Sequence, residues 1–356
     1  MLSVTLVTLG DPQILTGGYL YHRRMAALAP DNAARVNFVS VPDVVFPLST
    51  ATGLPVLRRI AQQHPDVVLL DSIAAGFLAP WLPVRWPRVP IVGMLHQPPG
   101  GIDHGRVRTA IQAVLDRAAY RSTARLLVAS AALADELAAA GIPRTRLRVV
   151  PPGRDVAPKS AALPADLRHG RRAAFLSVGN WVARKGLLDL LEALSRLPDD
   201  AATLHLVGDT ASDPAYAAAV RARMAAPELV ARVVVHGPLP TERVAALYQA
   251  TDAFVLASSR EPYGTVYGEA MAAGRPVVGY AAGNLPHLAR DGREGLVVPP
   301  GDVEALATAL QRLADDEALR IRLGQAARRR ASGFPTWQES AAALFAQLRD
   351  VSSRKH

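Results

Sequence analysis

Two carboxylates enclose a stretch with one proline and two glycines, EPYGTVYGE, in which Glu261 comes first and Glu269 last. A buried strand is expected before it, at 252–258, and Thr265 is expected to begin a helix. The first turn of a helix presents unpaired backbone N–H groups and favours an anion such as phosphate. Carboxylates cannot hold a phosphate, but they accept hydrogen bonds from hydroxyls. The spacing therefore fits a ligand with a phosphate in its middle and hydroxyls at both ends, such as a nucleoside diphosphate sugar. A pair of ordinary surface glutamates is the alternative.

A second loop, GNWVARKG (179–186), places adjacent cations before the helical stretch GLLDLLEAL. The helix dipole opposes cations at a helix start, so Arg184 and Lys185 need a reason to be there. A bound diphosphate supplies one, because cations stabilise the charge that grows on a departing phosphate group. The chain has three lysines, which makes Lys185 conspicuous. Two solvated surface charges are the alternative.

Two loops of the first half carry further candidates. In GDPQILTGGYLYHRRMAALA (10–29), Gly17 and Gly18 precede a helix, and paired glycines let backbone amides approach a ligand closely. His96 follows the strand VPIVGML, where its side chain is expected to reach the edge of the sheet. The glycines do not form the GxGxxG dinucleotide fingerprint. A plain connection and a structural histidine are the alternatives.

The elements that must position these loops are short apolar runs that alternate with longer helical stretches. Most runs are continuously apolar, as in parallel strands buried on both faces. We therefore expect an α/β protein with doubly wound parallel sheets, whose ligands bind at the carboxyl ends of the strands. The expected strands are 2–9, 35–41, 66–71, 89–95, 124–130, 173–179, 203–209, 232–237, 252–258, 276–280 and 295–298.

A stretch rich in proline, alanine and charge, residues 151–172, interrupts this alternation. We read it as a linker between two domains. The expected amino-terminal domain is 1–155, the expected carboxyl-terminal domain is 156–335, and the last helix, 336–356, is expected to pack back on the first domain.

Composition narrows the classes of function. The 356 residues include no cysteine, which excludes disulfides and thiolate chemistry and makes a reducing, cytoplasmic location the expectation. No two aspartates stand two apart and no Cys/His ligand cluster occurs, so no metal site and no cofactor are expected. Only 5% of residues are aromatic and no basic tract interleaves with them, which disfavours nucleic-acid binding.

Charge is distributed unevenly along the chain. Residues 1–160 hold 17 Lys and Arg against 10 Asp and Glu, whereas residues 161–356 hold 23 against 21. The segment 79–90 adds Trp81, Arg85, Trp86 and Arg88 to the basic half, and helix 54–64 adds a basic face. Tryptophan with arginine suits a lipid headgroup zone, so peripheral contact with the inner membrane face stays open beside a packed loop.

The block EPYGTVYGEAMAAGRPVV resembles the signature of retaining glycosyltransferases of the GT-B fold, family 4, whose mark is two glutamates separated by seven residues. The segments VASAALADELAAAGIPRTRLRVVPPGRD, LSVGNWVARKGLLDLLEAL and DGREGLVVPPGDVEALATAL follow in the family's order. The resemblance implies two Rossmann-like domains that face each other across a cleft, the first on the acceptor side and the second binding a nucleotide sugar. It implies transfer of a hexose, without metal, to a hydroxyl of a lipid, a glycan or a small natural product, with a UDP-sugar as the expected co-substrate.

The resemblance also implies roles for single residues. Glu269 would bind the ribose and Glu261 the sugar hydroxyls. The family often has an arginine where Asn180 stands, so we assign the second cation's role to Arg184. The implied catalytic residues are His96, Arg184, Lys185 and Glu261. The implied donor-binding residues are Asn180, Gly208, Asp209, His236, Gly237, Gly264, Thr265, Val266 and Glu269. The implied acceptor and phosphate loop residues are Gly17, Gly18 and Ser130. A nucleotide-sugar epimerase of the same architecture and a non-catalytic nucleotide-sugar-binding module are the alternatives.

Overall fold

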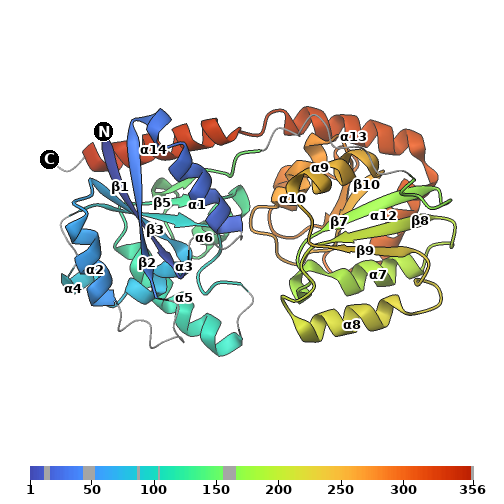
Figure 1. The fold of residues 1–356 in the computed structure, drawn as a ribbon, viewed down its shortest axis with the longest axis horizontal. Coiled ribbons are helices and arrows are strands. Elements are labelled where there is room, and N and C mark those ends of the chain that lie inside the picture. The colour runs from blue at the N-terminus through green and yellow to red at the C-terminus, as the bar shows by residue number, and fades with distance from the viewer. Residues whose placement is uncertain (12–16, 43–52, 86–88, 103–104, 155–165, 354–356) are drawn as a thin grey trace. The chain divides into compact units, whose positions relative to one another are not determined.

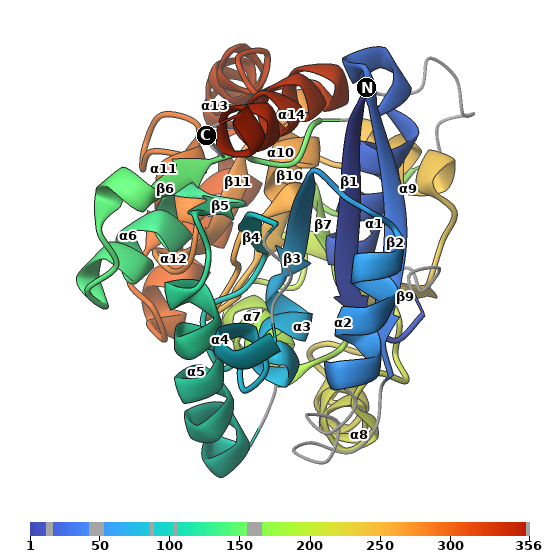
Figure 2. The ribbon, with the colours of Figure 1, turned by 90° about the vertical axis from the view of Figure 1, so that its left-hand side faces the viewer.

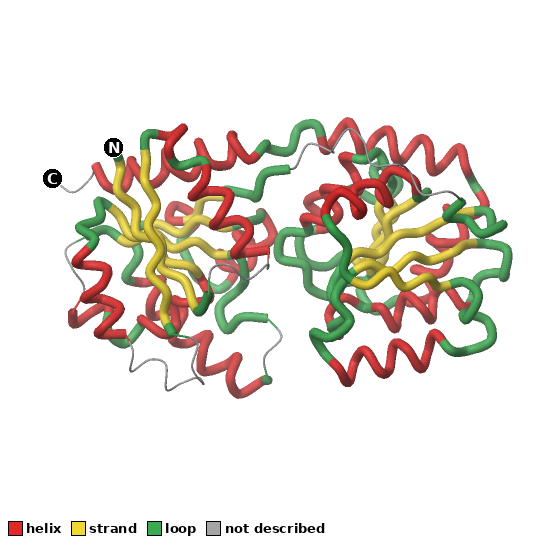
Figure 3. Tube along the Cα trace, in the orientation of Figure 1, coloured by secondary structure: helices red, strands yellow, loops and turns green. Residues whose placement is uncertain are grey.

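The computed structural model describes residues 1–11, 17–42, 53–85, 89–102, 105–154 and 166–353. The chain divides into two compact units. Unit 1 comprises Met1–Gly153 with Pro335–His356, and unit 2 comprises Arg154–Phe334. Each unit contains one six-stranded sheet with helices packed against it, as Figures 1 and 3 show. None of the helices in the described ranges is long and apolar enough to cross a bilayer.

The sheet of unit 1 is entirely parallel and has the strand order β2-β1-β3-β4-β5-β6. Its strands are β1 (Leu2–Leu9), β2 (Ala34–Val41), β3 (Val67–Asp71), β4 (Ile91–Leu95), β5 (Arg125–Val128) and β6 (Leu147–Val149). Its helices are α1 (Gly17–Ala27), α2 (Gly53–Gln62), α3 (Ser72–Leu78), α4 (Leu82–Arg85), α5 (Arg106–Arg121), α6 (Ala131–Ala139) and α14 (Trp337–Ser353).

Successive side chains of the unit 1 strands enter two different cores. In β3, Val67 and Leu69 pack with α1 and α14, whereas Val68 and Leu70 pack with α2, α3, α5 and α6. A strand turns alternate residues to opposite faces, so a sheet covered on both sides needs apolar residues at every position. This requirement explains the continuous apolar runs in the sequence.

Helix α14 belongs to unit 1, although it follows unit 2 in the chain. Figure 2 shows it, in red, crossing above the sheet of this unit. Phe345 and Leu348 are fully buried in the same core cluster as Val4 and Leu6 of β1. The chain therefore passes from unit 1 to unit 2 and back, and the return is fixed by burial of one apolar helix face.

The sheet of unit 2 is also entirely parallel and has the order β12-β11-β10-β7-β8-β9. Its strands are β7 (Ala173–Val178), β8 (Ala202–Val207), β9 (Val233–Gly237), β10 (Ala253–Leu256), β11 (Val277–Tyr280) and β12 (Gly295–Val298). Its helices are α7 (Leu187–Ser195), α8 (Pro214–Met224), α9 (Thr241–Ala250), α10 (Thr265–Ala272), α11 (Leu285–Leu288), α12 (Val303–Asp315) and α13 (Glu317–Ala331).

The eleven strands expected from the sequence are all present, and none of their ends is shifted by more than two residues. The sequence did not predict β6, which lies at the edge of its sheet. This strand has three residues, of which only Leu147 is buried. So short a run with one buried side chain gives no usable periodicity.

Candidate functional site

The carboxylate of Glu261 in unit 2 is paired with the two cations of the 179–186 loop. Lys185 Nζ donates to Glu261 Oε2 at 2.6 Å, and Arg184 Nη1 lies 3.7 Å from the same oxygen. The side chains of Lys185 and Glu261 are only 9% and 13% exposed. A charge so shielded from water needs an opposite charge beside it, and Lys185 and Glu261 provide this for each other. We call Arg184, Lys185 and Glu261 the Lys185–Glu261 cluster.

Glycines bring the two loops of this cluster together. Gly186 has φ +66°, and a Cβ there would lie 1.9 Å from the carbonyl oxygen of Ala257. A Cβ on Gly179 would lie 3.2 Å from Lys185 Cε, so the lysine stem runs closely past that glycine. A third loop, between β11 and α11, packs on Glu261: Gly283 has φ +55°, and the neighbouring Asn284 amide donates to the carbonyl oxygen of Glu261. A side chain at Gly186 would separate the cations from the carboxylate.

The amino terminus of α10 follows Glu261 directly. Gly264 is its N-cap with φ +82°, and no acidic residue lies in the first turn. At such a terminus the amides of Thr265 and Val266 have no carbonyl partner in a preceding turn. Thr265 is exposed. A helix start with adjacent cations and no local acid in its first turn favours an anion.

Glu269 lies one turn further along α10, beside a cavity of about 290 Å³. The cavity wall is mainly apolar, with Leu239, Val244 and Tyr248 from the β9–α9 region. Burial, reinforced by the charge of Glu269, raises the pKa of Tyr248 well above its ordinary value. A flat, mostly apolar ligand group with a hydroxyl-bearing neighbour would fit between these walls and the carboxylate.

The carboxyl ends of β7, β8 and β9 meet beside these loops. The amide of Gly208 donates to the carbonyl oxygen of Gly237, and a Cβ on Gly208 would lie 2.1 Å from the carbonyl oxygen of Gly179. Asn180 Oδ1 accepts from the amide of Asp209 at 3.3 Å. The loops that follow the three strands are therefore held together by backbone contacts that only glycine permits.

Two predicted donor-binding side chains of this edge are engaged within the protein. The carboxylate of Asp209 accepts from the Ser212 hydroxyl and the Ala211 amide, which lowers its pKa. The ring of His236 stacks on His205, with His205 Nδ1 and His236 Nε2 3.0 Å apart. His236 is also absent from the wall of the cavity at Glu269. Both side chains thus have partners within unit 2, and their role in donor binding stays a prediction.

In unit 1, His96 packs in a buried group of polar and aromatic side chains. Its ring centroid lies 4.9 Å from that of His22 and 4.7 Å from that of Tyr21. His22 Nε2 and Asp71 Oδ2 are hydrogen-bonded at 2.8 Å, and Thr8 Oγ1 donates to the same carboxylate oxygen at 3.1 Å. We call His22, Asp71 and His96 the His22–Asp71–His96 cluster.

The cluster has a defined charge pattern. Burial and the nearby His22 lower the pKa of His96 to about 3, so its ring is neutral at pH 7. Burial acts to raise the pKa of Asp71, but the charge of His22 and the hydrogen bond to it hold that pKa below its ordinary value. His96 Nε2 is buried without a hydrogen-bond partner within the described ranges. A neutral imidazole with a nitrogen left over can still accept or donate one hydrogen bond.

The predicted acceptor-loop residues lie in this unit. Gly17 and Gly18 begin α1, and a Cβ on Gly18 would lie 3.7 Å from the His96 ring. Residues 12–16 of the same loop lie outside the described residues. Ser130 is buried and caps α6, since its hydroxyl accepts from the Leu133 amide at 3.1 Å. In the structure, Gly18 lies beside His96, and Ser130 acts as the N-cap of α6.

Two family descriptions together match more than nine tenths of the chain. "Glycosyl transferases group 1" matches residues 162–330, and "Glycosyltransferase Family 4" matches residues 3–157. The chain belongs to glycosyltransferase family 4.

Individual proteins of known name are similar to this family 4 chain. It is 31% identical over 221 residues to a D-inositol 3-phosphate glycosyltransferase of Xylanimonas cellulosilytica. That alignment covers 59% of this chain and 52% of the relative, so the chain spans about half the length of the curated relative it matches. Its fold is similar to that of sucrose-phosphate synthase from Thermosynechococcus elongatus, with a TM-score of 0.82, 22% identity and coverage of 99% and 100% of the two chains.

A second solved structure is similar throughout. Anabaena HepE, in complex with UDP-glucose, has a TM-score of 0.77 and 20% identity, with coverage of 97% of this chain and 99% of that one. The family 4 chain therefore has the GT-B fold, and the resemblance seen in its sequence is confirmed.

Sequence reasoning did not single out His22, Asp71 or Tyr248. His22 lies four residues after Gly18 on α1, and Asp71 is the last residue of β3, so both stand at positions that face a ligand edge in this fold. Tyr248 lies four residues after Val244 on α9, a spacing that puts both on one helix face. These spacings could have indicated the three residues, but only if the neighbouring elements of the fold had already been known.

The His22–Asp71–His96 cluster could bind a metal ion, which bears on the expectation that the protein has no metal site. The potential ligand atoms of His22, Asp71 and His96 lie within 4.8 Å of one another. Two of them, His22 Nε2 and Asp71 Oδ2, already share a hydrogen bond, so an ion would have to displace its proton. The expectation of a metal-free family 4 site stays a prediction.

Proposed function

We propose that the chain transfers a hexose from a nucleoside diphosphate sugar to an acceptor hydroxyl, with retention at the anomeric carbon. The observation that carries the proposal is the Lys185–Glu261 cluster at the amino terminus of α10. It combines cations and helix amides for a diphosphate with a carboxylate for sugar hydroxyls. The similarity to HepE, whose structure holds UDP-glucose, supports a UDP-sugar as the donor.

The geometry suggests a role for each group. Lys185, Arg184 and the amides of Gly264, Thr265 and Val266 bind the diphosphate. Glu261 then exchanges part of its hydrogen bonding with Lys185 for the hydroxyls of the donor sugar. Glu269 accepts from the ribose hydroxyls, and the cavity beside it, walled by Tyr248, receives the base.

The reaction breaks the bond between the anomeric carbon and the diphosphate oxygen and forms a bond from that carbon to the acceptor oxygen. The acceptor proton passes to the departing diphosphate, whose added charge is stabilised by Lys185, Arg184 and the helix terminus. His96, neutral and with Nε2 available, offers a hydrogen bond to the transferred sugar without adding a charge. In this scheme residues 156–335 bind the donor, and residues 1–155 with helix 336–356 supply the acceptor side.

A product assay tests this proposal. The protein is incubated with a panel of nucleotide sugars, with and without sugar, polyol and lipid acceptors, and released nucleoside diphosphate is quantified by chromatography. We expect release above simple hydrolysis only when donor and acceptor are both present, and loss of release in Glu261→Ala and Lys185→Ala. Conversion of donor without any acceptor would instead indicate the epimerase, and full turnover in both variants would refute the site assignment.

We also propose that unit 1 contacts an anionic membrane surface through α5, which Figure 2 labels. Val107, Ile111 and Val114 are 75%, 48% and 64% exposed, and their spacing of four and three puts them on one helix face. The buried face of α5 carries Gln112, Ala113, Asp116, Ala119 and Tyr120, and Leu115 packs against the core. Val107, Ile111 and Val114 are the large aliphatic side chains that this helix exposes. The helix also bears four arginines: Arg106, Arg108, Arg117 and Arg121. Outward apolar residues among arginines suit an anionic lipid interface.

The segments named from the sequence lie only in part within the described residues. Trp81 is only half-buried but packs against the core of unit 1, and a Cβ on Gly53 would overlap its ring. Trp86 and Arg88 lie outside the described residues. Arg58 and Arg59 of α2 are exposed.

Vesicle sedimentation tests the membrane proposal. We expect binding to vesicles with phosphatidylglycerol, none to pure phosphatidylcholine, and a clear loss in Ile111→Ser. Val230→Ser removes an aliphatic side chain of unit 2 that is 64% exposed and serves as the matched control. Equal binding of both variants, or no binding at low salt, would refute this contact.

A further inference from the structure

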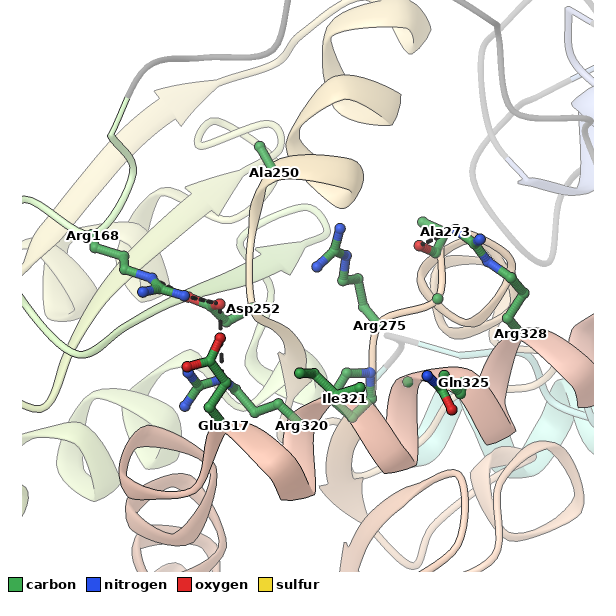
Figure 4. Close-up of a pocket in the computed structure, with 13 residues that line it drawn as sticks. Arg168, Ala250, Asp252, Ala273, Arg275, Glu317, Arg320, Ile321, Gln325 and Arg328 are labelled. Carbon is green, nitrogen blue, oxygen red and sulfur yellow. Dashed lines mark hydrogen bonds and ion pairs between the residues drawn. The ribbon is translucent and has the colours of Figure 1, made fainter.

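Unit 2 contains a second cavity, of about 490 Å³. It lies at the amino-terminal ends of the strands, whereas the Lys185–Glu261 cluster lies at their carboxyl ends. Asp252 and Pro276, which line it, directly precede β10 and β11, so the cavity lies where these strands begin. Glu261, in contrast, follows the end of β10. Figure 4 shows the cavity between the start of α13, the end of α10 and the loop that bears Arg168. Its size is that of a site for a small metabolite.

Cationic side chains dominate the wall of this cavity. The wall includes four arginines and two acids, which leaves two positive charges in excess: Arg168, Arg275, Arg320 and Arg328 against Asp252 and Glu317. Asp252 is already neutralised by Arg168, whose Nε and Nη2 donate to its two oxygens at 2.9 and 2.7 Å. An excess of guanidinium groups around a cavity favours an anion with several acceptor oxygens.

Arg275 is the residue that points most directly to a ligand. It is half-buried, and its Nη2 donates to the carbonyl oxygen of Gln249. Its Nε is buried without a partner in the part of the chain that the structure describes. Burial is also the main cause that lowers the pKa of Arg275. A buried donor without an acceptor costs free energy. Because this N–H is shielded from solvent, an anion in the cavity would reach it after a rotation of the guanidinium, and that rotation would relieve the unpaired donor.

Two further guanidinium groups are held in place before any ligand arrives. Arg328 Nη2 donates to the carbonyl oxygen of Ala273 at 3.2 Å, at the end of α10. Arg320 is 6% exposed and donates to the carbonyl oxygens of Leu313 and Ala314, at the end of α12. Each guanidinium has five N–H donors, so these bonds fix its orientation and leave other donors for a ligand.

We propose that this cavity is a binding site for a phosphate monoester, with Arg275 as the residue that contacts the phosphate group. A monoester is close to doubly negative at neutral pH and so matches the two excess positive charges. A cavity of about 490 Å³ exceeds the needs of a phosphate ion alone and leaves room for its organic part. The site is separate from the proposed donor site, although α10 extends from one to the other.

Calorimetric titration tests the proposal with glycerol 2-phosphate as the monoester, inorganic phosphate as the bare ion and glycerol as the control without phosphate. Every titration contains saturating UDP, so that a diphosphate site near Lys185 is already filled. We expect glycerol 2-phosphate to bind at least as tightly as inorganic phosphate and glycerol not to bind. Absence of heat up to about 10 mM of either phosphate would overturn the site, since affinity would then be too weak to matter. Tighter binding of the bare ion than of the monoester would overturn its assignment to a monoester.

Three variants separate a built site from general positive charge. Arg275→Gln is expected to weaken glycerol 2-phosphate binding about tenfold, because one charge-assisted hydrogen bond is lost. Glu317→Gln is expected to tighten it about threefold, because a repelling carboxylate at the rim is removed. Arg322 lies on α13, as Glu317 does, but outside the wall of the cavity. Arg322→Gln is therefore the matched control and is expected to leave binding unchanged.

The pattern across the variants decides the outcome. Equal weakening in Arg275→Gln and Arg322→Gln would show that net charge alone attracts the anion and would overturn the proposal. A Glu317→Gln protein that binds no tighter than the parent would also contradict it. If Arg275→Gln does not fold, as judged by thermal unfolding, Arg328→Gln takes its place with the same expected loss.

Discussion

In unit 2, the Lys185–Glu261 cluster brings together two loops whose own sequences contain the relevant residues, GNWVARKG and EPYG. In unit 1, the His22–Asp71–His96 cluster takes one residue from α1, one from the end of β3 and one from the end of β4. The first cluster joins two adjacent cations of one glycine-bearing loop to a carboxylate of another such loop. The second is built from single residues that only the folded sheet brings together.

This difference affects what each cluster can tolerate. In the Lys185–Glu261 cluster, Lys185 and Glu261 are mostly shielded from water, but Arg184 is 25% exposed, so a ligand can share the cations. In the His22–Asp71–His96 cluster, His22 and Asp71 are 0% and 1% exposed, and His96 is half-buried. We therefore expect changes in the first cluster to act mainly on turnover and changes in the second to act first on stability.

The largest effect is expected for Lys185→Ala. It removes the cation proposed to neutralise the departing diphosphate, so kcat should fall by about 10²- to 10³-fold. It also leaves Glu261 without its partner, which should cost about 3 kcal/mol of unfolding free energy. Steady-state kinetics and chemical denaturation measure the two losses. Lys185→Arg keeps the charge and should retain part of the turnover; an equally inactive Lys185→Arg and an unaffected Lys185→Ala would each contradict the assigned role.

The second-largest effect, a loss of stability, is expected for Asp71→Asn in unit 1. The substitution removes the charge that His22 contacts, and we expect a loss of about 2 to 3 kcal/mol at pH 7. The pKa of Asp71 is lower in the folded state than in the unfolded chain, so its contribution is present above about pH 4 and is lost as the pH falls further. The stability difference between the parent and Asp71→Asn should therefore shrink in acid.

Urea denaturation between pH 3 and pH 7 measures that difference. Thr8→Val is the control, because it removes a hydrogen bond to Asp71 but keeps the charge. Its effect on stability should be smaller and should persist at lower pH than that of Asp71→Asn. A difference for Asp71→Asn that does not change with pH would show that its charge does not stabilise the fold.

A smaller effect is expected for Glu269→Gln. The amide keeps the shape of the side chain but loses the charge that accepts from ribose hydroxyls, so UDP should bind about 10- to 30-fold more weakly. Calorimetry compares UDP with uracil, which lacks the ribose. Uracil binding should be unchanged by the substitution, and an equal loss for both ligands would indicate that the cavity has simply collapsed.

Ser130→Ala should have the smallest effect. The hydroxyl caps α6, so the expected loss is about 1 kcal/mol of unfolding free energy with kcat and KM unchanged. This variant tests a residue of unit 1 for which the family resemblance implies a role in the acceptor loop, whereas the structure shows a helix cap. A loss of kcat/KM with unchanged stability would support that role over the cap.

The sequence predicted the fold well because its signals are local. Continuous apolar runs such as Val67–Leu70 of β3 identify buried parallel strands, and β6 was not predicted because only Leu147 of its three residues is buried. Glu261, Lys185 and Gly264 could be found for the same reason, since each stands in a loop with a recognisable pattern of glycine and charge.

Contacts between distant residues could not be predicted from these patterns. The sequence does not show that Lys185 and Glu261, 76 residues apart, form an ion pair. Nor does it show that His236 stacks on His205 or that Asp71 lies within 4.8 Å of His96. These contacts depend on which strands are neighbours and how their ends are aligned, which is a property of the sheet and not of any one segment.

The structure of the protein with bound UDP-glucose tests the central claim most directly. The account predicts that the diphosphate accepts from the amides at the start of α10 and from Lys185 and Arg184, with the ribose on Glu269 and the sugar hydroxyls on Glu261. A diphosphate bound at any other place, with Lys185 and Glu261 still paired only to each other, would contradict it.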